Sequence, residues 1–202
     1  MTFSGNVKNK IKKVLNRRSS MQDLAMANQD PSLLCLHLGC GSNYLDGWLN
    51  IDIIEGSRAD LIMNFKELPQ KFKPDSVSEV LMIHSISYLR LWEARDFFSN
   101  VYSLLKSTGK FTLEFPDLAK CSKALLSNEN KVDDYLEAVR AIYAFDMDQI
   151  KRKDNFQPYA FGWSSWHITS ELKKVGFKKI MVEEPQTHGP LLWRDTRIVA
   201  IK

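Results

Sequence analysis

The sequence contains few cysteines and no long apolar run. Three cysteines among 202 residues cannot all pair with one another, and none shows the close spacing of a zinc ribbon. Cys35 and Cys40 flank a short apolar segment, a position that favours buried and reduced thiols. No apolar segment approaches the roughly 20 residues that span a bilayer, and the first residues lack the apolar stretch of a signal peptide. We therefore expect a cytoplasmic protein without a transmembrane segment.

Two nucleotide-binding signatures and a metal-binding pattern are also missing. The turn after the first apolar run contains Gly39 and Gly41, but Tyr44 stands where the dinucleotide-binding fingerprint has its third glycine. The lysine of the Walker A motif is absent as well. No group of His, Asp and Glu residues has the spacing of metal ligands. These absences argue against NAD, ATP and a catalytic metal.

The net charge of +4 is concentrated in the N-terminal tail. Six lysines and arginines precede the first acidic residue, Asp23, and the rest of the chain is slightly acidic. Apolar residues at helical spacing between Val7 and Leu15 predict a basic amphipathic helix, followed by a linker up to Pro31. Such a helix can lie on anionic membranes, contact phosphates, or cover part of a neighbouring domain, which is the role we favour. We predict a basic helical extension at 1–31 and one domain at 32–202.

Short apolar runs alternate with helical patterns from Leu33 onward. This alternation predicts an α/β fold in which helices cover both faces of a mostly parallel, seven-stranded sheet. Between Pro116 and about Gly162 the strand pattern disappears, so a helical insertion is expected at about 117–162, including an amphipathic helix from Val132 to Tyr143. The expected strands occupy residues 33–38, 48–53, 59–63, 78–84, 110–115, 179–182 and 197–201.

Local signals predict the ends of two further helices. One helix buries Phe97 and Phe98 and is expected to close at Gly109, because glycine readily ends a helix. The other is expected to begin at Thr169 or Ser170, which can cap it, and to end at Gly176.

A glycine turn and an acid mark the clearest candidate site. Gly39-Cys40-Gly41 follows the first expected strand, where glycines let a ligand approach the backbone closely. Asp52 ends the second expected strand, where a carboxylate can accept hydrogen bonds from both hydroxyls of a ribose. Asp52 alone could equally cap a turn, but beside the glycine turn the ribose interpretation is favoured.

The residues around this turn resemble a known family. Residues 36–52, LHLGCGSNYLDGWLNID, resemble the opening of the class I S-adenosylmethionine-dependent methyltransferases, closest to the methyltransferase type 11-like branch with the signature LHLGCGS-x-x-L-x-GW-x-N-x-D. Further segments match family motifs in the same order along the chain, and the resemblance covers about residues 33–202. These segments are NFKELP at 64–69, HSISYL at 84–89, LLKSTGK at 104–110, FPDL at 115–118 and VGF at 175–177.

The resemblance implies a Rossmann-like fold with an antiparallel last strand, S-adenosylmethionine as cofactor, and a set of pocket residues. Three departures from the family pattern are visible. Asn43 replaces a frequent third glycine, Ser87-Tyr88 replaces Glu-His, and Asn64 replaces an acid placed near the adenine amine, although the Asn64 carbonyl can accept the same hydrogen bond. The implied cofactor pocket contains Gly39, Cys40, Gly41, Asp52, Asn64 and His84, with Leu68 lining the adenine face.

Histidines are the candidate catalytic residues. His84 follows the fourth expected strand, beside the implied position of the methyl group, and is the leading polar candidate. His167 lies in the aromatic segment 161–167, which is either an acceptor pocket or a small core under a loop, so His167 is either an acceptor base or a partner at a helix start. His37 alternates inside a buried strand and is expected to be a hydrogen-bonded core residue. The loop 187–195 is a second candidate for contact with the acceptor.

Three functions are compatible with the sequence. The favoured one is methyl transfer to a small-molecule or glycan-type acceptor, because the chain is compact. The departures at Asn64, Ser87 and Tyr88 would also suit a protein that binds the cofactor without turnover. A third hypothesis makes residues 1–20 an RNA-binding arm of an RNA methyltransferase. The sequence does not indicate an oligomeric state.

Overall fold

In a computed structural model of the protein, the structure describes residues 33–127, 132–145, 157–187 and 189–202. The predicted N-terminal extension at 1–31 lies outside these residues, so the domain division stays a prediction. Part of the predicted insertion at 117–162 also lies outside them. Among the described helices, none combines the length and the apolar character that crossing a membrane requires.

Seven strands form one sheet in the order β3-β2-β1-β4-β5-β7-β6. Neighbouring strands are parallel from β3 to β5, whereas β7 runs antiparallel to both β5 and β6. The predicted seven-stranded, mostly parallel sheet with an antiparallel last strand is therefore confirmed. The strands are β1 (Cys35–Leu38), β2 (Leu49–Asp52), β3 (Leu61–Ile62), β4 (Val77–Ile83), β5 (Leu105–Pro116), β6 (Lys179–Glu183) and β7 (Asp195–Ile201).

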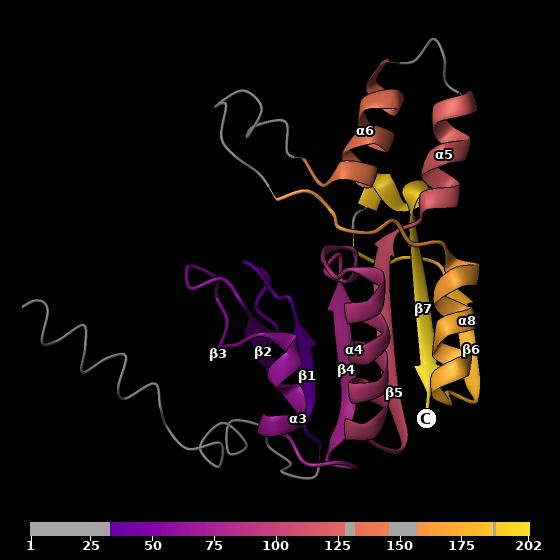
Figure 1. The fold of residues 1–202 in the computed structure, drawn as a ribbon. Coiled ribbons are helices and arrows are strands. Elements are labelled where there is room, and N and C mark those ends of the chain that lie inside the picture. The colour runs from indigo at the N-terminus through magenta and orange to yellow at the C-terminus, as the bar shows by residue number, and fades with distance from the viewer. Residues whose placement is uncertain (1–32, 128–131, 146–156, 188) are drawn as a thin grey trace, which may run out of the picture.

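Three helices cover one face of this sheet: α3 (Leu68–Lys71), α4 (Leu91–Leu104) and α8 (Ser165–Val175) (Figure 1). Helix α4 buries Phe97, Phe98 and Val101 against the strands, as its apolar spacing predicts. The connections at 39–48 and 53–60 are too short for a helical crossover and contain no helix. These two connections therefore place no helix on the opposite face of the sheet. The alternation of strands and helices had predicted helices on both faces.

Two helices stand beyond the carboxyl end of β5 (Figure 1). They are α5 (Leu118–Ser127) and α6 (Val132–Tyr143), within the segment where a helical insertion is predicted. The buried guanidinium of Arg194, in the 3₁₀ helix η3 (Gly189–Arg194), contacts the Glu137 carboxylate of α6 at 3.2 Å. This ion pair fastens α6 to the segment that leads into β7.

Two helix boundaries differ from the sequence-based expectation. Helix α8 begins at Ser165 because the Asp117 carboxylate, at the end of β5, accepts the Ser165 N–H at 3.0 Å. The expected cap at Thr169 or Ser170 is therefore wrong, although the predicted end at Gly176 is confirmed. Helix α4 ends at Leu104 and not at Gly109, because the buried Leu105 already pairs with Val77 as the first residue of β5.

His37 is a hydrogen-bonded core residue, as predicted. Its Nδ1 lies 3.0 Å from Asn50 Oδ1, and its side chain is almost fully buried. Burial lowers the pKa of His37 below its usual 6.5, against smaller opposing effects of the Asn50 hydrogen bond and the Asp52 charge.

This lowered pKa predicts a specific pH dependence of stability. Above pH 6.5 the ring is neutral in both the folded and the unfolded chain, so its contribution is constant. As the pH falls from 6.5 towards the lowered pKa of the folded state, only the unfolded chain binds a proton there, and the free energy of unfolding falls by up to about 1.4 kcal/mol per pH unit. Urea denaturation between about pH 7.5 and 5.5 should give a steeper loss for the natural protein than for His37→Gln; equal slopes would contradict the assignment.

Candidate active site

A cavity of about 1410 Å³ opens at the carboxyl ends of β2, β1 and β4. Strands β1 and β4 are neighbours, and the chain continues from β1 to β2 on one side and from β4 to β5 on the other, so the connections leave the two carboxyl ends in opposite directions. Ligands of open α/β sheets bind at such a switch point. The residues that follow or end these three strands, Gly39 to Gly41, Asp52 and His84, all line this cavity.

Two glycines shape the bend after β1. Gly39 and Gly41 have φ values of +69° and +53°, a region that glycine adopts without steric cost. The Gly39 N–H donates to the Ile51 carbonyl at 2.8 Å, which ties the bend to β2. A Cβ on Gly39 would overlap the Ser85 side chain, whereas a Cβ on Gly41 would meet nothing within 4 Å. Gly39 therefore serves packing, and Gly41 keeps the floor of the cavity open.

The Asp52 carboxylate points at this bend. Its Oδ2 accepts the Gly41 N–H at 2.7 Å and its Oδ1 accepts the Ile54 N–H at 2.9 Å. Each carboxylate oxygen can accept two hydrogen bonds, so these two bonds use half of the capacity of the group. The remaining capacity suits a ligand with two adjacent hydroxyls.

Cys40 lies between the two glycines and lines the same cavity. Its side chain is almost fully buried. Burial raises the pKa of the Cys40 thiol to about 11, and the nearby carboxylates of Asp52 and Asp60 act in the same direction. At neutral pH the thiol is therefore protonated, which suits packing against a ligand better than nucleophilic chemistry.

The expected adenine-facing residues are only partly at the cavity. Asn64 lines it, but its Oδ1 already accepts the Lys66 N–H at 3.0 Å as the cap of the 3₁₀ helix η1 (Phe65–Glu67). Leu68 is fully buried in the core and is not among the residues that line the cavity. Phe65 lines it instead, because the turn of η1 directs Leu68 into the core and leaves Phe65 half-buried at the cavity.

An apolar pair that the sequence interpretation missed follows Asp52. Ile53 and Ile54 are 59% and 61% exposed, and both line the cavity. Isolated exposed isoleucines are common, but two in succession beside a polar ligand site offer an apolar surface for a planar ring. The sequence contained one signal for this apolar surface, because the two isoleucines directly follow Asp52.

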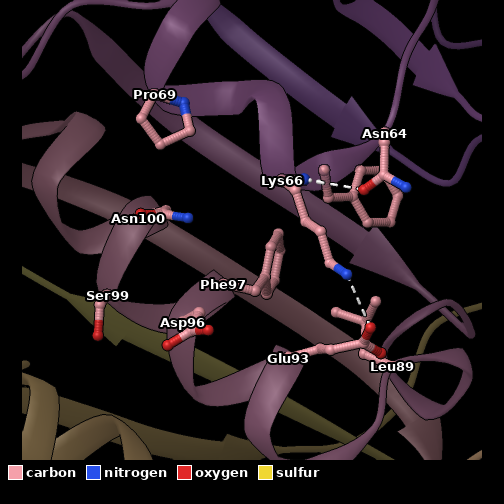
Figure 2. Close-up of a pocket in the computed structure, with 10 residues that line it drawn as sticks. Asn64, Lys66, Pro69, Leu89, Glu93, Asp96, Phe97, Ser99 and Asn100 are labelled. Atoms are coloured by element: carbon pink, nitrogen blue, oxygen red, sulfur yellow. Dashed lines mark hydrogen bonds and ion pairs between the residues drawn. The ribbon is translucent and has the colours of Figure 1, made fainter.

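A second cavity, of about 440 Å³, adjoins the first between η1 and α4 (Figure 2). The Lys66 ammonium lies 2.8 Å from the Glu93 carboxylate, and both residues line the two cavities. The smaller cavity contains neither the glycine bend nor Asp52, so we assign the ligand site to the larger one. The two cavities also share Asn64, Phe65 and Leu89.

His84 faces the larger cavity in a strained backbone conformation. Its φ is +53°, a value that is uncommon for a residue with a Cβ, and its N–H donates to the Glu114 carbonyl at 2.7 Å. Its Nε2 lies 2.9 Å from Asp195 Oδ2, and the Asp195 side chain is fully buried. Asp195 belongs to the candidate loop 187–195 but had no role in the sequence interpretation. Residue 188 of that loop lies outside the described residues.

His167 is not among the residues that line this cavity. On α8 it contacts Phe161, Trp163 and Trp166 with ring centroids 5.0–5.8 Å apart. Trp163 is fully buried and belongs to the main core. Of the two interpretations of the segment 161–167, packing therefore accounts for Trp163 and His167, whereas Phe161 alone reaches the cavity wall.

Aromatic side chains form one wall of the larger cavity. Tyr88 and Tyr159 pack edge to face with ring centroids 4.8 Å apart, and Trp92 lies under the Arg90 guanidinium at 5.8 Å. Burial raises the pKa of both tyrosine hydroxyls, so both stay protonated and can donate hydrogen bonds. Tyr88 stands where the motif of the family that the sequence resembles has a histidine.

The comparisons with known proteins bear on the fold. No protein-family model and no curated protein sequence matches this chain. Its structure is similar to solved structures of S-adenosylmethionine-dependent methyltransferases from three organisms. One from Archaeoglobus fulgidus has 12% identity and a TM-score of 0.57, with 93% of each chain covered.

The other two structures agree with the first. One from Methanosarcina mazei has 15% identity and a TM-score of 0.56, covering 89% of this chain and 96% of the other. One from Mesorhizobium loti has 16% identity and a TM-score of 0.55, covering 85% and 91%. The chain therefore has the fold of the class I S-adenosylmethionine-dependent methyltransferases.

Proposed function

We propose that this protein is an S-adenosylmethionine-dependent methyltransferase that acts on a small-molecule or glycan-type acceptor. The observation that carries the proposal is the Asp52 carboxylate, which faces the Gly41 N–H at the switch point of the sheet. When bound, S-adenosylmethionine supplies a methyl group, carried on a positively charged sulfur, and a nucleophile can accept this methyl group.

The residues at the cavity fit the adenosyl group of this cofactor. Asp52 has capacity for two hydroxyl donors, which matches the two hydroxyls of a ribose. Ile53 and Ile54 present exposed apolar surface beside it, which suits the faces of a purine. The open space at Gly41 leaves room for the chain that carries the sulfur.

Asn64 would contact the edge of the base. Because one lone pair of its carbonyl oxygen is used by the Lys66 N–H, the Asn64 amide nitrogen is the group best placed to bind a ligand. A donor at this position complements a ring nitrogen of adenine. The earlier interpretation, in which the carbonyl accepts from the adenine amine, would require the second lone pair of the same oxygen.

The cavity is large enough for an acceptor beside the cofactor. Small-molecule sites usually measure about 300–1,000 Å³, and this cavity exceeds that range with about 1410 Å³. Beyond the bend it is lined by His84 and the aromatic wall formed by Tyr88, Trp92, Tyr159 and Phe161. Aromatic faces and hydroxyl donors suit a ring-shaped or glycan-type acceptor.

Calorimetric titration against a panel of nucleotides tests this proposal. S-adenosylmethionine and S-adenosylhomocysteine should bind with micromolar dissociation constants, whereas NAD and ATP should show no heat of binding at the same concentrations. Incubation with methyl-labelled S-adenosylmethionine and a cell extract should then label an acceptor. Binding of NAD or ATP in preference to the adenosyl ligands would contradict the proposal. Tight cofactor binding without label transfer would favour the non-catalytic alternative.

We also propose the reducing cytoplasm as the compartment in which the protein acts. All three cysteines are free thiols, and Cys40 and Cys121 are buried. Burial is the largest cause that raises the pKa of the Cys121 thiol, to about 12, so this thiol is protonated and unreactive at neutral pH. Titration with a thiol reagent before and after unfolding should show two thiols that react only in the unfolded chain.

A further inference from the structure

A histidine–carboxylate pair lies in the wall of the larger cavity. His84 follows β4 and Asp195 begins β7, so the sheet brings together two residues that are 111 positions apart in the sequence. The Asp195 side chain is fully buried, and the His84 side chain is 18% exposed towards the cavity. Asp195 Oδ1 also lies 3.4 Å from the buried Arg194 Nε. Arg194 is therefore an ion-pair partner of the carboxylate, and His84, not Asp195, lines the cavity.

The backbone of His84 is strained to make this contact. A φ of +53° is unfavourable for a residue with a Cβ, and such outliers collect at sites where the surrounding structure imposes a side-chain direction. Here the Glu114 carbonyl binds the His84 N–H at 2.7 Å, and Asp195 binds the ring at 2.9 Å. One contact fixes the backbone of His84 and the other fixes its ring, which lines the cavity.

The charged side chains among the described lining residues already have partners. Among the described lining residues the carboxylates are Asp52 and Glu93. Asp52 accepts the N–H groups of Gly41 and Ile54, and Glu93 is bound to the Lys66 ammonium. The Arg90 guanidinium lies over the Trp92 ring and 3.5 Å from the Glu93 carboxylate.

We propose that His84 is the general base for O-methylation of a hydroxyl acceptor and that Asp195 positions its ring, an inference that rests on the proposed function. With Nε2–H donating to Asp195, the ring accepts the hydroxyl proton at Nδ1. The acceptor oxygen forms the new bond to the methyl carbon, and the carbon–sulfur bond breaks with its electron pair on sulfur. The positive charge thereby passes from sulfur to the imidazole, and Asp195, a positioning residue, stabilises it there.

The first test examines the pair without any substrate. In ¹⁵N-histidine NMR spectra of the full chain, His84 should be the Nε2–H tautomer, and Asp195→Asn should change its ring nitrogen shifts. A neutral Nδ1–H tautomer, or unchanged shifts in Asp195→Asn, would overturn the proposal. His84→Asn serves to assign the signals, because asparagine tolerates a positive φ better than most residues.

The second test identifies the bond that the methyl group forms. With methyl-labelled S-adenosylmethionine and a cell extract, the labelled product should be an ether, which survives mild alkali. Label on nitrogen, carbon, sulfur or a carboxylate ester would overturn the proposal. Absence of cofactor binding in calorimetry would instead contradict the proposed function, so the two failures are distinguishable.

The variants connect the two tests. His84→Asn should lower the rate of labelling by about 100- to 10,000-fold, the usual range for loss of a general base, and this loss should be much larger than any loss of cofactor affinity. Asp195→Asn should lower the turnover rate and leave the Michaelis constant for the cofactor unchanged. His167→Asn, which removes a histidine outside the cavity lining, should label within about twofold of the natural protein. Equal rates for His84→Asn and His167→Asn would overturn the role of His84.

Discussion

Replacing Asp52 by asparagine should weaken binding of S-adenosylhomocysteine by about 100-fold or more. The variant keeps the shape of the side chain but removes its negative charge, so two hydrogen bonds from ribose hydroxyls lose their charged acceptor. Each such bond is worth about 1.5–3 kcal/mol, and a loss of about 3 kcal/mol in total corresponds to this change in affinity. Calorimetric titration of both proteins with the same ligand measures it.

A matched control separates this local effect from the loss of one surface charge. Asp46→Asn makes the same chemical change at an exposed position near the bend and should leave the dissociation constant unchanged within about twofold. Thermal denaturation should show that Asp52→Asn is still folded. Equal affinities for the two variants would show that Asp52 does not contact the ligand.

Replacing Gly39 by alanine should lower the free energy of unfolding by about 3 kcal/mol. An L-residue at its φ of +69° costs about 1–2 kcal/mol, and the new Cβ would overlap the Ser85 side chain, which adds a similar packing cost. Urea denaturation monitored by circular dichroism measures the change. The same variant should bind the cofactor weakly, because the bend has to move.

Gly41→Ala is the control for the conformational part of this effect. Its φ of +53° carries the same backbone cost, but the added Cβ meets nothing within 4 Å. It should therefore cost only about 1–2 kcal/mol of stability, while the methyl group enters the cavity and weakens cofactor binding. Gly39→Ala combined with Ser85→Gly should recover the packing part of the loss. Equal destabilisation by both alanine variants would contradict the close contact at Ser85.

The sequence predicted the features whose determinants are local. Apolar runs bounded by glycine placed the strands, and strand β2 ends at Asp52 as expected. The bend and Asp52 are close in the sequence and lie on adjacent parallel strands, so their meeting at one sheet edge follows from the topology. The direct bond between Asp52 and the Gly41 N–H is the outcome on which the cofactor interpretation depended.

Features that rest on distant contacts were not predictable in the same way. The pairing of His84 with Asp195 depends on β7 running antiparallel to β5, so that its first residue arrives beside the end of β4. The start of α8 depends on the carboxylate of Asp117, 48 positions earlier in the chain. No local pattern near Thr169 contains that information, so the best local cap was chosen instead.

The adenine-facing residues show a third kind of difference. The motif NFKELP located the correct segment, but the direction of each side chain depends on the 3₁₀ turn of η1. That turn buries Leu68 in the core and brings Phe65 to the cavity, and it commits the Asn64 carbonyl to a backbone N–H. A motif can therefore locate a site to within a turn of helix without assigning its contacts.

The most direct test of the cofactor site is a crystal structure with S-adenosylhomocysteine bound. Both ribose hydroxyls should lie within about 3.2 Å of the Asp52 carboxylate oxygens, with the sulfur directed towards His84. A ligand held in the smaller cavity beside Lys66 and Glu93, or with its ribose away from Asp52, would contradict it.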